Sequence, residues 1–90
     1  MITRSFTIRN TLGLHARPSA QITQAASRFK SEVFMTKDGR RVNAKSIMGV
    51  MMLAAGCGSV VTVETAGADE EQAMAAVGAL IEGGFGEQAA

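Results

Sequence analysis

The chain is poor in the residues that build disulfides, metal sites and aromatic surfaces. Its 90 residues include one cysteine, one histidine, one proline, no tryptophan and no tyrosine. A lone cysteine forms no internal disulfide, which fits a reducing compartment, and one histidine with one cysteine cannot build a zinc site. With only four phenylalanines, stacking surfaces for nucleic-acid bases are scarce. These absences argue against a disulfide scaffold, a zinc protein and a nucleic-acid-binding domain.

Long apolar runs are also missing. No stretch reaches the roughly 18 residues of a membrane span, and the first six residues alternate in polarity instead of forming a signal-peptide block. Apolar residues make up 47% of the chain, enough for a modest core but not for a large substrate cavity as well. We therefore expect a single domain over residues 1–90, monomeric and cytoplasmic, with no cofactor, metal ion or membrane partner.

Basic residues are absent from the second half of the chain. Residues 1–45 carry all nine Lys and Arg and two acidic residues, a net charge of +7, whereas residues 46–90 carry six acidic residues. Such asymmetry favours an acidic or phosphate-bearing partner for the basic half. The alternative is that both sets of charges form ordinary solvated faces.

Apolar periodicity and turn residues divide the chain into seven elements. They are strands at residues 2–9, 32–37, 40–43 and 60–65, and helices at residues 16–29, 46–54 and 69–82. The order β-α-β-β-α-β-α gives one amphipathic sheet face that three helices can cover, which predicts a two-layer α+β sandwich with an antiparallel sheet.

Particular residues mark the turns and ends of these elements. The Asp38-Gly39 pair predicts a hairpin turn. Asp69 and Gln72 predict a capping box for the last helix. Glycines 56 and 58 are expected to end the second helix. Beyond the Gly83-Gly84 pair, the remaining tail is expected to be frayed.

The run Gly13-Leu14-His15-Ala16-Arg17-Pro18 concentrates the candidate chemistry, because it places the only histidine directly before a helical pattern. A neutral imidazole is a competent nucleophile near pH 7. A phosphoryl group on it brings about two negative charges, which the Ala16 and Arg17 amides at a helix N-terminus and the Arg17 side chain can hold. The sequence alone also allows a plain surface histidine near a helix start.

A second run, Lys45-Ser46-Ile47-Met48-Gly49-Val50-Met51, has a serine at the helix entrance. Ser46 is the expected N-cap, a role that explains a serine there and stabilises a helix by about 1 kcal/mol relative to alanine.

The helix behind Ser46 is apolar on nearly every side. A helix that covers one sheet face needs a single buried stripe, for example Ile47, Val50, Met51 and Ala54. The excess apolar residues, Met48 foremost, are expected to face solvent, where methionine adapts to several partners. Our candidates for partner docking are Ile47, Met48 and Met51; the alternative is a deeply buried helix.

Together the two runs resemble the HPr phosphocarrier family of the bacterial phosphotransferase system, over essentially the whole chain. The resemblance implies an open-faced β-sandwich, in which three helices cover one face of a four-stranded antiparallel sheet. It implies that His15 accepts a phosphoryl group on Nδ1 from enzyme I and passes it to IIA proteins, with Arg17 assisting the phosphate. On the same resemblance, Ser46 matches a serine that HPr kinase/phosphorylase modifies in many members.

Two details stay open at this point. Ser19 stands where many members have alanine, and it could donate to the phosphate or cap the helix. Residues 52–57 and 85–87 resemble the nitrogen-related branch of the family (NPr), which affects the partner but not the chemistry.

Two other functions are alternatives. One is a mainly regulatory binding module acting through Ser46, although members with only that role lack the histidine that this chain has. The other is a small RNA-binding domain, since the β-α-β-β-α-β core overlaps the pattern of ferredoxin-like RNA binders.

Overall fold

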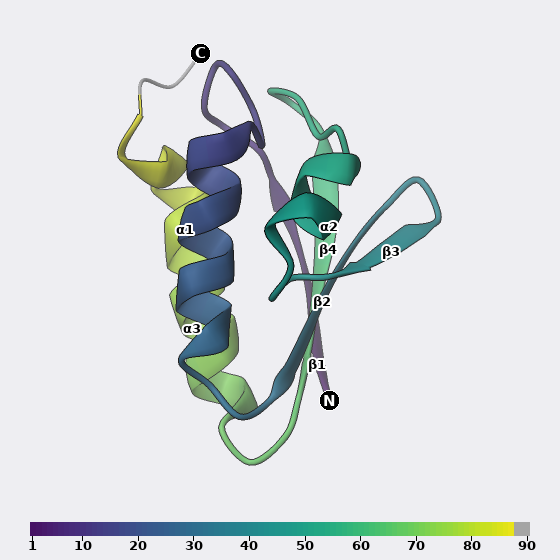
Figure 1. The fold of residues 1–90 in the computed structure, drawn as a ribbon, viewed down its shortest axis with the longest axis vertical. Coiled ribbons are helices and arrows are strands. Elements are labelled where there is room, and N and C mark those ends of the chain that lie inside the picture. The colour runs from purple at the N-terminus through teal and green to yellow at the C-terminus, as the bar shows by residue number, and fades with distance from the viewer. Residues whose placement is uncertain (88–90) are drawn as a thin grey trace.

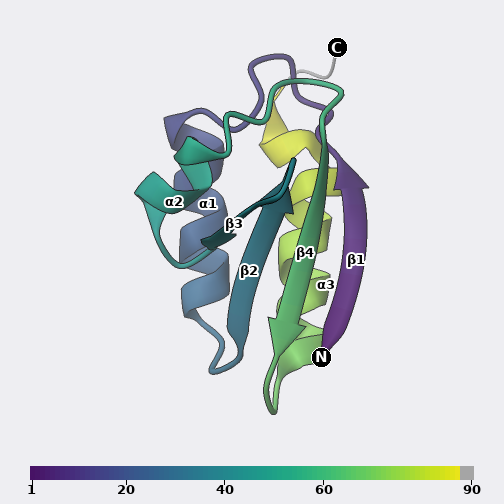
Figure 2. The same ribbon diagram turned by 90° about the vertical axis from the view of Figure 1, so that its right-hand side faces the viewer.

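The computed structural model describes residues 1–87. Its elements are β1 (Ile2–Thr7), α1 (Ala16–Ser27), β2 (Glu32–Lys37), β3 (Arg40–Asn43), α2 (Ile47–Met52), β4 (Val60–Ala66), α3 (Glu70–Glu82) and the 3₁₀ turn η1 (Gly84–Gly86). The helices lie on one side of the sheet and leave its other face open (Figures 1 and 2). The predicted β-α-β-β-α-β-α order and open-faced α+β architecture are confirmed.

The four strands form one sheet in the order β1-β4-β2-β3, and every neighbouring pair is antiparallel. Strand β4 is central, with Phe6 of β1 opposite Val61 and Met35 of β2 opposite Val63. Side chains alternate between the two faces of a strand. Accordingly Val61, Val63 and Thr65 are buried under the helices, while the residues between them face outwards.

The core lies between this sheet face and the stripes of α1 and α3. Ile22 and Ala26 of α1 are fully buried, as are Ala73, Val77 and Ile81 of α3, each four residues from the next. This spacing keeps the buried side chains on one helix face. Leu80, one residue before Ile81, is only half-buried.

The Asp38-Gly39 hairpin turn is confirmed. Asp38 has φ +51° and Gly39 has φ +80°, the left-handed conformation that a two-residue turn between twisted antiparallel strands requires. The turn joins β2 to β3 with Lys37 paired to Arg40.

The second helix differs from its prediction in length and in its buried stripe. It ends at Met52, because Ala54 turns the chain with φ +51° before the glycines are reached. Of the expected stripe, only Val50 is buried, whereas Ile47, Met51 and Ala54 are exposed; the C-cap residue Leu53, just after the helix, is buried as well. A helix this short turns only one narrow side toward the core.

The predicted capping box at the start of α3 is wrong. The Asp69 side chain makes no hydrogen bond to its own helix. It accepts hydrogen bonds from the Lys30 amide (2.9 Å), the Ser31 amide (2.9 Å) and the Ser31 hydroxyl (2.5 Å) in the loop before β2. The Ser31 hydroxyl above all, and the Lys30 amide next, lower the pKa of Asp69 to about 2, because they stabilise its ionised form.

The chain beyond α3 does not fray at Gly84. It folds back as η1, and the Phe85 side chain is buried, with 4% of its surface exposed. The Gln21 side-chain amide donates to the Phe85 carbonyl oxygen at 3.4 Å. This apolar anchor carries Glu87 to the entrance of α1; residues 88–90 lie outside the described residues.

Candidate functional site

His15 is the N-cap residue of α1, with extended backbone angles of φ −78° and ψ −169°. Its carbonyl oxygen accepts the Ser19 amide at 3.1 Å, while its ring makes no capping hydrogen bond. About a third of the side chain (35%) is exposed to solvent. The ring is therefore reachable from outside and takes no part in holding the helix end.

The loop that presents His15 is joined to the segment after α2. The Leu14 amide donates to the Ala55 carbonyl oxygen at 2.9 Å, and the Leu14 side chain is buried. Gly13 has φ +69°, and a Cβ atom there would collide with the Ala55 carbonyl oxygen. Only glycine combines that conformation with so close an approach.

The first turn of α1 leaves donors available beside the ring. Within residues 1–87, nothing accepts a hydrogen bond from the Ala16 or Arg17 amide, and the Pro18 nitrogen carries no hydrogen. Arg17 is exposed and has no hydrogen bond or ion pair with any described residue. The unpaired amides of a helix N-terminus, together with a guanidinium, can bind a phosphoryl group.

Ser19 does not belong to this set of donors. Its side chain is fully buried, and its hydroxyl donates to the Leu14 carbonyl oxygen at 3.2 Å. It ties the loop before His15 to the first turn of the helix.

A carboxylate that the sequence reasoning missed contacts the His15 ring. Nε2 lies 2.9 Å from Glu87 Oε2 and 3.1 Å from Glu87 Oε1. The Asn10 side-chain amide donates to Glu87 Oε1 at 3.0 Å and to the Gly13 carbonyl oxygen at 2.7 Å, and Asn10 is fully buried.

The hydrogen bond with His15 is the main cause that lowers the pKa of Glu87, ahead of the one from Asn10 and the positive field of Arg17. Glu87 is thus held as a carboxylate. One feature of the sequence could have indicated this contact. Phe85 stands between two glycines in an apparent tail, and a large apolar residue such as Phe85 is expected to be buried.

Ser46 caps α2 as predicted. Its hydroxyl oxygen accepts the Gly49 amide at 3.1 Å, and the residue is exposed. The neighbouring Lys45 ammonium donates to the Phe29 carbonyl oxygen at 2.9 Å, just beyond the end of α1.

The structure does not bring His15 and Ser46 together. The chain after α2 contacts the start of α1, whereas the chain before α2 contacts its end, so the two helices run in opposite directions (Figure 1). The two candidate phosphorylation sites therefore flank α2 at its opposite ends.

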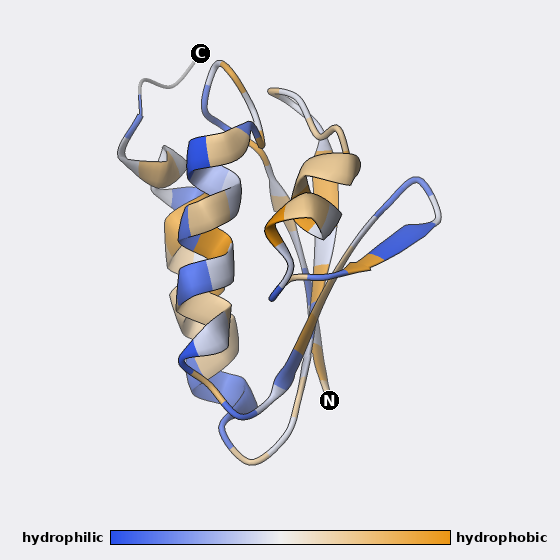
Figure 3. Ribbon diagram, in the orientation of Figure 1, coloured by the Kyte–Doolittle hydropathy of each residue, from blue (hydrophilic) through white to orange (hydrophobic). Residues whose placement is uncertain are grey.

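An apolar surface lies between them. We call it the α2 surface: its residues are Ile47, Met48, Met51 and Met52, with exposed fractions of 42, 67, 37 and 57%. Helix α2 is apolar along its whole length (Figure 3). The exposure predicted for Met48 is confirmed, and the alternative of a deeply buried helix is wrong.

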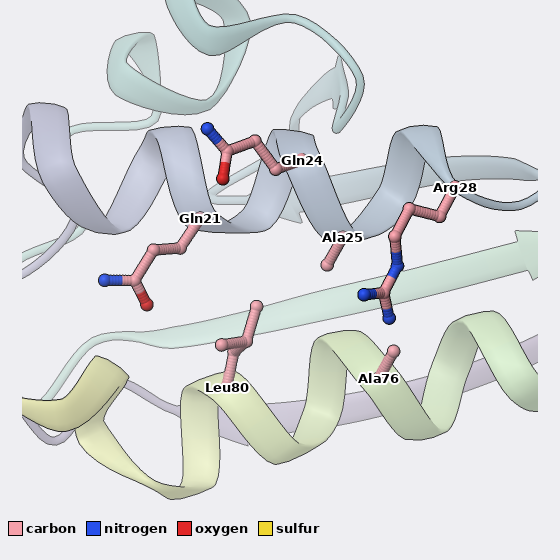
Figure 4. A pocket seen from close by; sticks show the side chains of 6 residues that line it. All are labelled: Gln21, Gln24, Ala25, Arg28, Ala76 and Leu80. Carbon is pink, nitrogen blue, oxygen red and sulfur yellow. The ribbon is translucent and has the colours of Figure 1, made fainter.

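An open groove of about 430 Å³ lies elsewhere, between α1 and α3. Gln21, Gln24, Ala25, Arg28, Ala76 and Leu80 line it (Figure 4). None of the predicted site residues is among them, so the candidate chemistry sits on the surface rather than in this groove.

Residues 1–87 contain no cluster of three or more His, Cys, Asp or Glu side chains that is arranged to hold a metal ion. No helix in the same range has the length and apolar character needed to cross a membrane.

Known proteins share both the sequence and the fold. The family described as "PTS HPr component phosphorylation site" matches residues 2–83. The phosphocarrier protein HPr of Cupriavidus necator is 62% identical over 97% of this chain and 98% of its own length. That of Neisseria meningitidis is 60% identical with the same coverage.

Among solved structures, HPr-C-His from Thermoanaerobacter tengcongensis has a TM-score of 0.94 and 48% identity, covering 98% of this chain and 99% of its own. Sequence match and structural match extend over the same, nearly complete length. The chain therefore belongs to the HPr family of phosphocarrier proteins of the phosphotransferase system.

Proposed function

We propose that this protein carries a phosphoryl group on His15 between other proteins of the phosphotransferase system. The observation that carries the proposal is the arrangement at the start of α1. An accessible imidazole lies beside the Ala16 and Arg17 amides and the Arg17 side chain, none of which has a hydrogen-bond or ion-pair partner within residues 1–87. A nucleophile next to donors for a dianion is what accepting a phosphoryl group requires.

The transfer is an exchange between two imidazoles. The lone pair of His15 Nδ1 attacks the phosphorus of a phosphohistidine on enzyme I, and a new N–P bond forms while the donor's N–P bond breaks. The Ala16 and Arg17 amides and the Arg17 guanidinium hold the three phosphoryl oxygens. The reverse exchange delivers the group to a IIA protein. The protein is a substrate of enzyme I with no turnover of its own.

The α2 surface is the proposed docking site for both partners. Ile47, Met48 and Met51 lie on the helix whose following segment contacts the His15 loop, and they are exposed without a partner among residues 1–87. Exposed methionines adjust to differently shaped partners. One surface can thus serve the donor and the acceptor in turn, with the protein acting as a single-domain monomer in the cytoplasm.

Phosphorylation of Ser46 by HPr kinase/phosphorylase is the proposed regulation. The Ser46 hydroxyl is exposed at the far end of the α2 surface. A phosphate adds a charge of roughly −1.5 to −2. That charge repels an acidic partner surface without reaching the His15 donors, so it weakens docking rather than chemistry.

The test is phosphorylation by enzyme I with phosphoenolpyruvate. We expect an acid-labile label on the wild-type protein and on Ser46→Ala, and none on His15→Ala. Label retained on His15→Ala contradicts the assignment. A label obtained only with ATP and HPr kinase, acid-stable and lost in Ser46→Ala, favours the regulatory module instead.

A further inference from the structure

We propose that Glu87 is a positioning residue for His15: it keeps the ring proton on Nε2, so that Nδ1 is the nucleophile, and it balances the charge of the phosphorylated ring. The inference rests on the proposed carrier function and goes beyond it, because it assigns a role to the segment that follows α3.

The contact geometry decides which nitrogen carries the proton. Both carboxylate oxygens of Glu87 lie within hydrogen-bond distance of Nε2, at 2.9 and 3.1 Å. A carboxylate only accepts hydrogen bonds, so Nε2 must be the donor. A neutral imidazole has a single N–H, which leaves the lone pair of the ring on Nδ1.

Glu87 is itself held in place, as a positioning group must be. The buried Asn10 amide donates to Oε1 at 3.0 Å. Phe85, two residues earlier, is buried and receives the Gln21 amide at its carbonyl oxygen. Contacts from the loop after β1 and from α1 therefore fix the carboxylate, whose side chain is only 16% exposed.

The carboxylate also matches the charge that the reaction creates. When Nδ1 takes the phosphoryl group and Nε2 keeps its proton, the ring becomes a phosphoimidazolium with a positive charge. Glu87 faces that charge from the Nε2 side, while the phosphoryl group on Nδ1 meets the Arg17 side chain and the Ala16 and Arg17 amides. When the group leaves, its N–P electron pair returns to Nδ1 and the ring is neutral again. No proton has to move in either direction.

The role resembles that of the aspartate in a serine-protease triad, which holds a histidine in the required tautomer and stabilises its cationic form. Here the orienting acid comes from a chain segment 72 residues away in sequence. Removing one charge-assisted hydrogen bond of this kind is expected to slow the transfer roughly tenfold or more.

The experiment compares the wild-type protein with Glu87→Gln, which keeps the side-chain shape but can also donate to Nε2. Glu82→Gln is the matched control, since it removes the same charge from the exposed end of α3. The chain contains one histidine, so its ring signals need no assignment. Nitrogen-15 spectra at about pH 8.5, where an ordinary imidazole is neutral, report the protonated nitrogen. Stopped-flow transfer from phosphorylated enzyme I reports the rate.

We expect Glu87→Gln to raise the Nδ1-protonated fraction and to slow the transfer ~10-fold, with Glu82→Gln like the wild type in both. An unchanged tautomer overturns the inference, even if the rate falls, because the effect would then be structural. An unchanged rate overturns it too. Wild-type protein that enzyme I cannot label defeats the carrier function itself, which is a different result.

Discussion

The N-cap residues of α1 and α2 differ in whether their side chains cap their own helix. Ser46 uses its side chain to satisfy its own helix, accepting the Gly49 amide at 3.1 Å. His15 makes no such bond, and its ring is held instead by Glu87 from the far end of the sequence. The cap at α2 is completed by its own serine, whereas the Ala16 and Arg17 amides at the start of α1 have no acceptor within the described part of the chain. When the side chain of an N-cap residue accepts no hydrogen bond from its helix, the backbone amides of the first turn remain available as donors to a ligand.

The largest expected effect is that of His15→Ala, which removes the only imidazole. We expect complete loss of acid-labile labelling by enzyme I, while the midpoint of thermal unfolding stays within a few degrees because the residue makes no capping bond. Autoradiography and circular dichroism check the two parts. A large drop in stability would show that the α1 entrance is as structural as the α2 entrance.

Arg17→Ala is expected to come next. The Arg17 side chain is exposed and unpaired within residues 1–87, so its removal costs little stability. A charged hydrogen bond to phosphate contributes roughly 1.5–3 kcal/mol, so the rate of transfer from enzyme I should fall about 10- to 100-fold. Arg17→Lys should recover part of the rate, because it restores the charge but not the two-pronged geometry. Equal rates in wild type and Arg17→Ala would contradict a role for this cation.

Ser46 provides the opposite test. Ser46→Ala should lower the free energy of unfolding by about 1 kcal/mol through loss of the cap and leave His15 labelling unchanged. Ser46→Asp retains a capping side chain, so it should keep the stability yet slow the transfer by weakening docking. Urea unfolding and the labelling rate separate the two effects. If Ser46→Asp transfers as fast as wild type, negative charge at this end of α2 does not regulate docking.

The smallest effect is expected at the start of α3, where the Asp69 carboxylate accepts hydrogen bonds from the loop before β2 instead of capping its own helix. The pKa of Asp69 is lowered from 3.8 to about 2, and the hydrogen bond from the Ser31 hydroxyl is the largest cause. A lowered pKa means that the folded state prefers the ionised form, so this stabilisation is complete above pH 4 and is lost as the pH falls toward 2. Asp69→Asn should therefore flatten the decline of stability between about pH 4 and pH 2. Urea unfolding at several pH values measures it, and parallel curves for the two proteins would contradict the contribution.

Sequence reasoning succeeded where a feature depends on neighbours along the chain. The hairpin at Asp38-Gly39, the cap at Ser46 and the stripes of α1 and α3 follow from turn chemistry and periodicity. It failed where two plausible local roles competed. Asp69 has the right residue type for a capping box, but three donors from another loop attract its carboxylate more strongly.

The element order, the sheet class, the family and the run that holds His15 and Arg17 were predictable from the amino-acid sequence, because they follow from local periodicity, turn residues and motifs. The buried stripe predicted for the second helix was right for Val50, but the burial of Leu53 and the exposure of Ile47 and Met51 depend on how α2 packs in the folded protein. The contact between Glu87 and the His15 ring likewise depends on the tertiary structure. That contact joins residues 72 positions apart, and no local pattern specifies it. It exists because burial of Phe85 folds the chain after α3 back onto the start of α1.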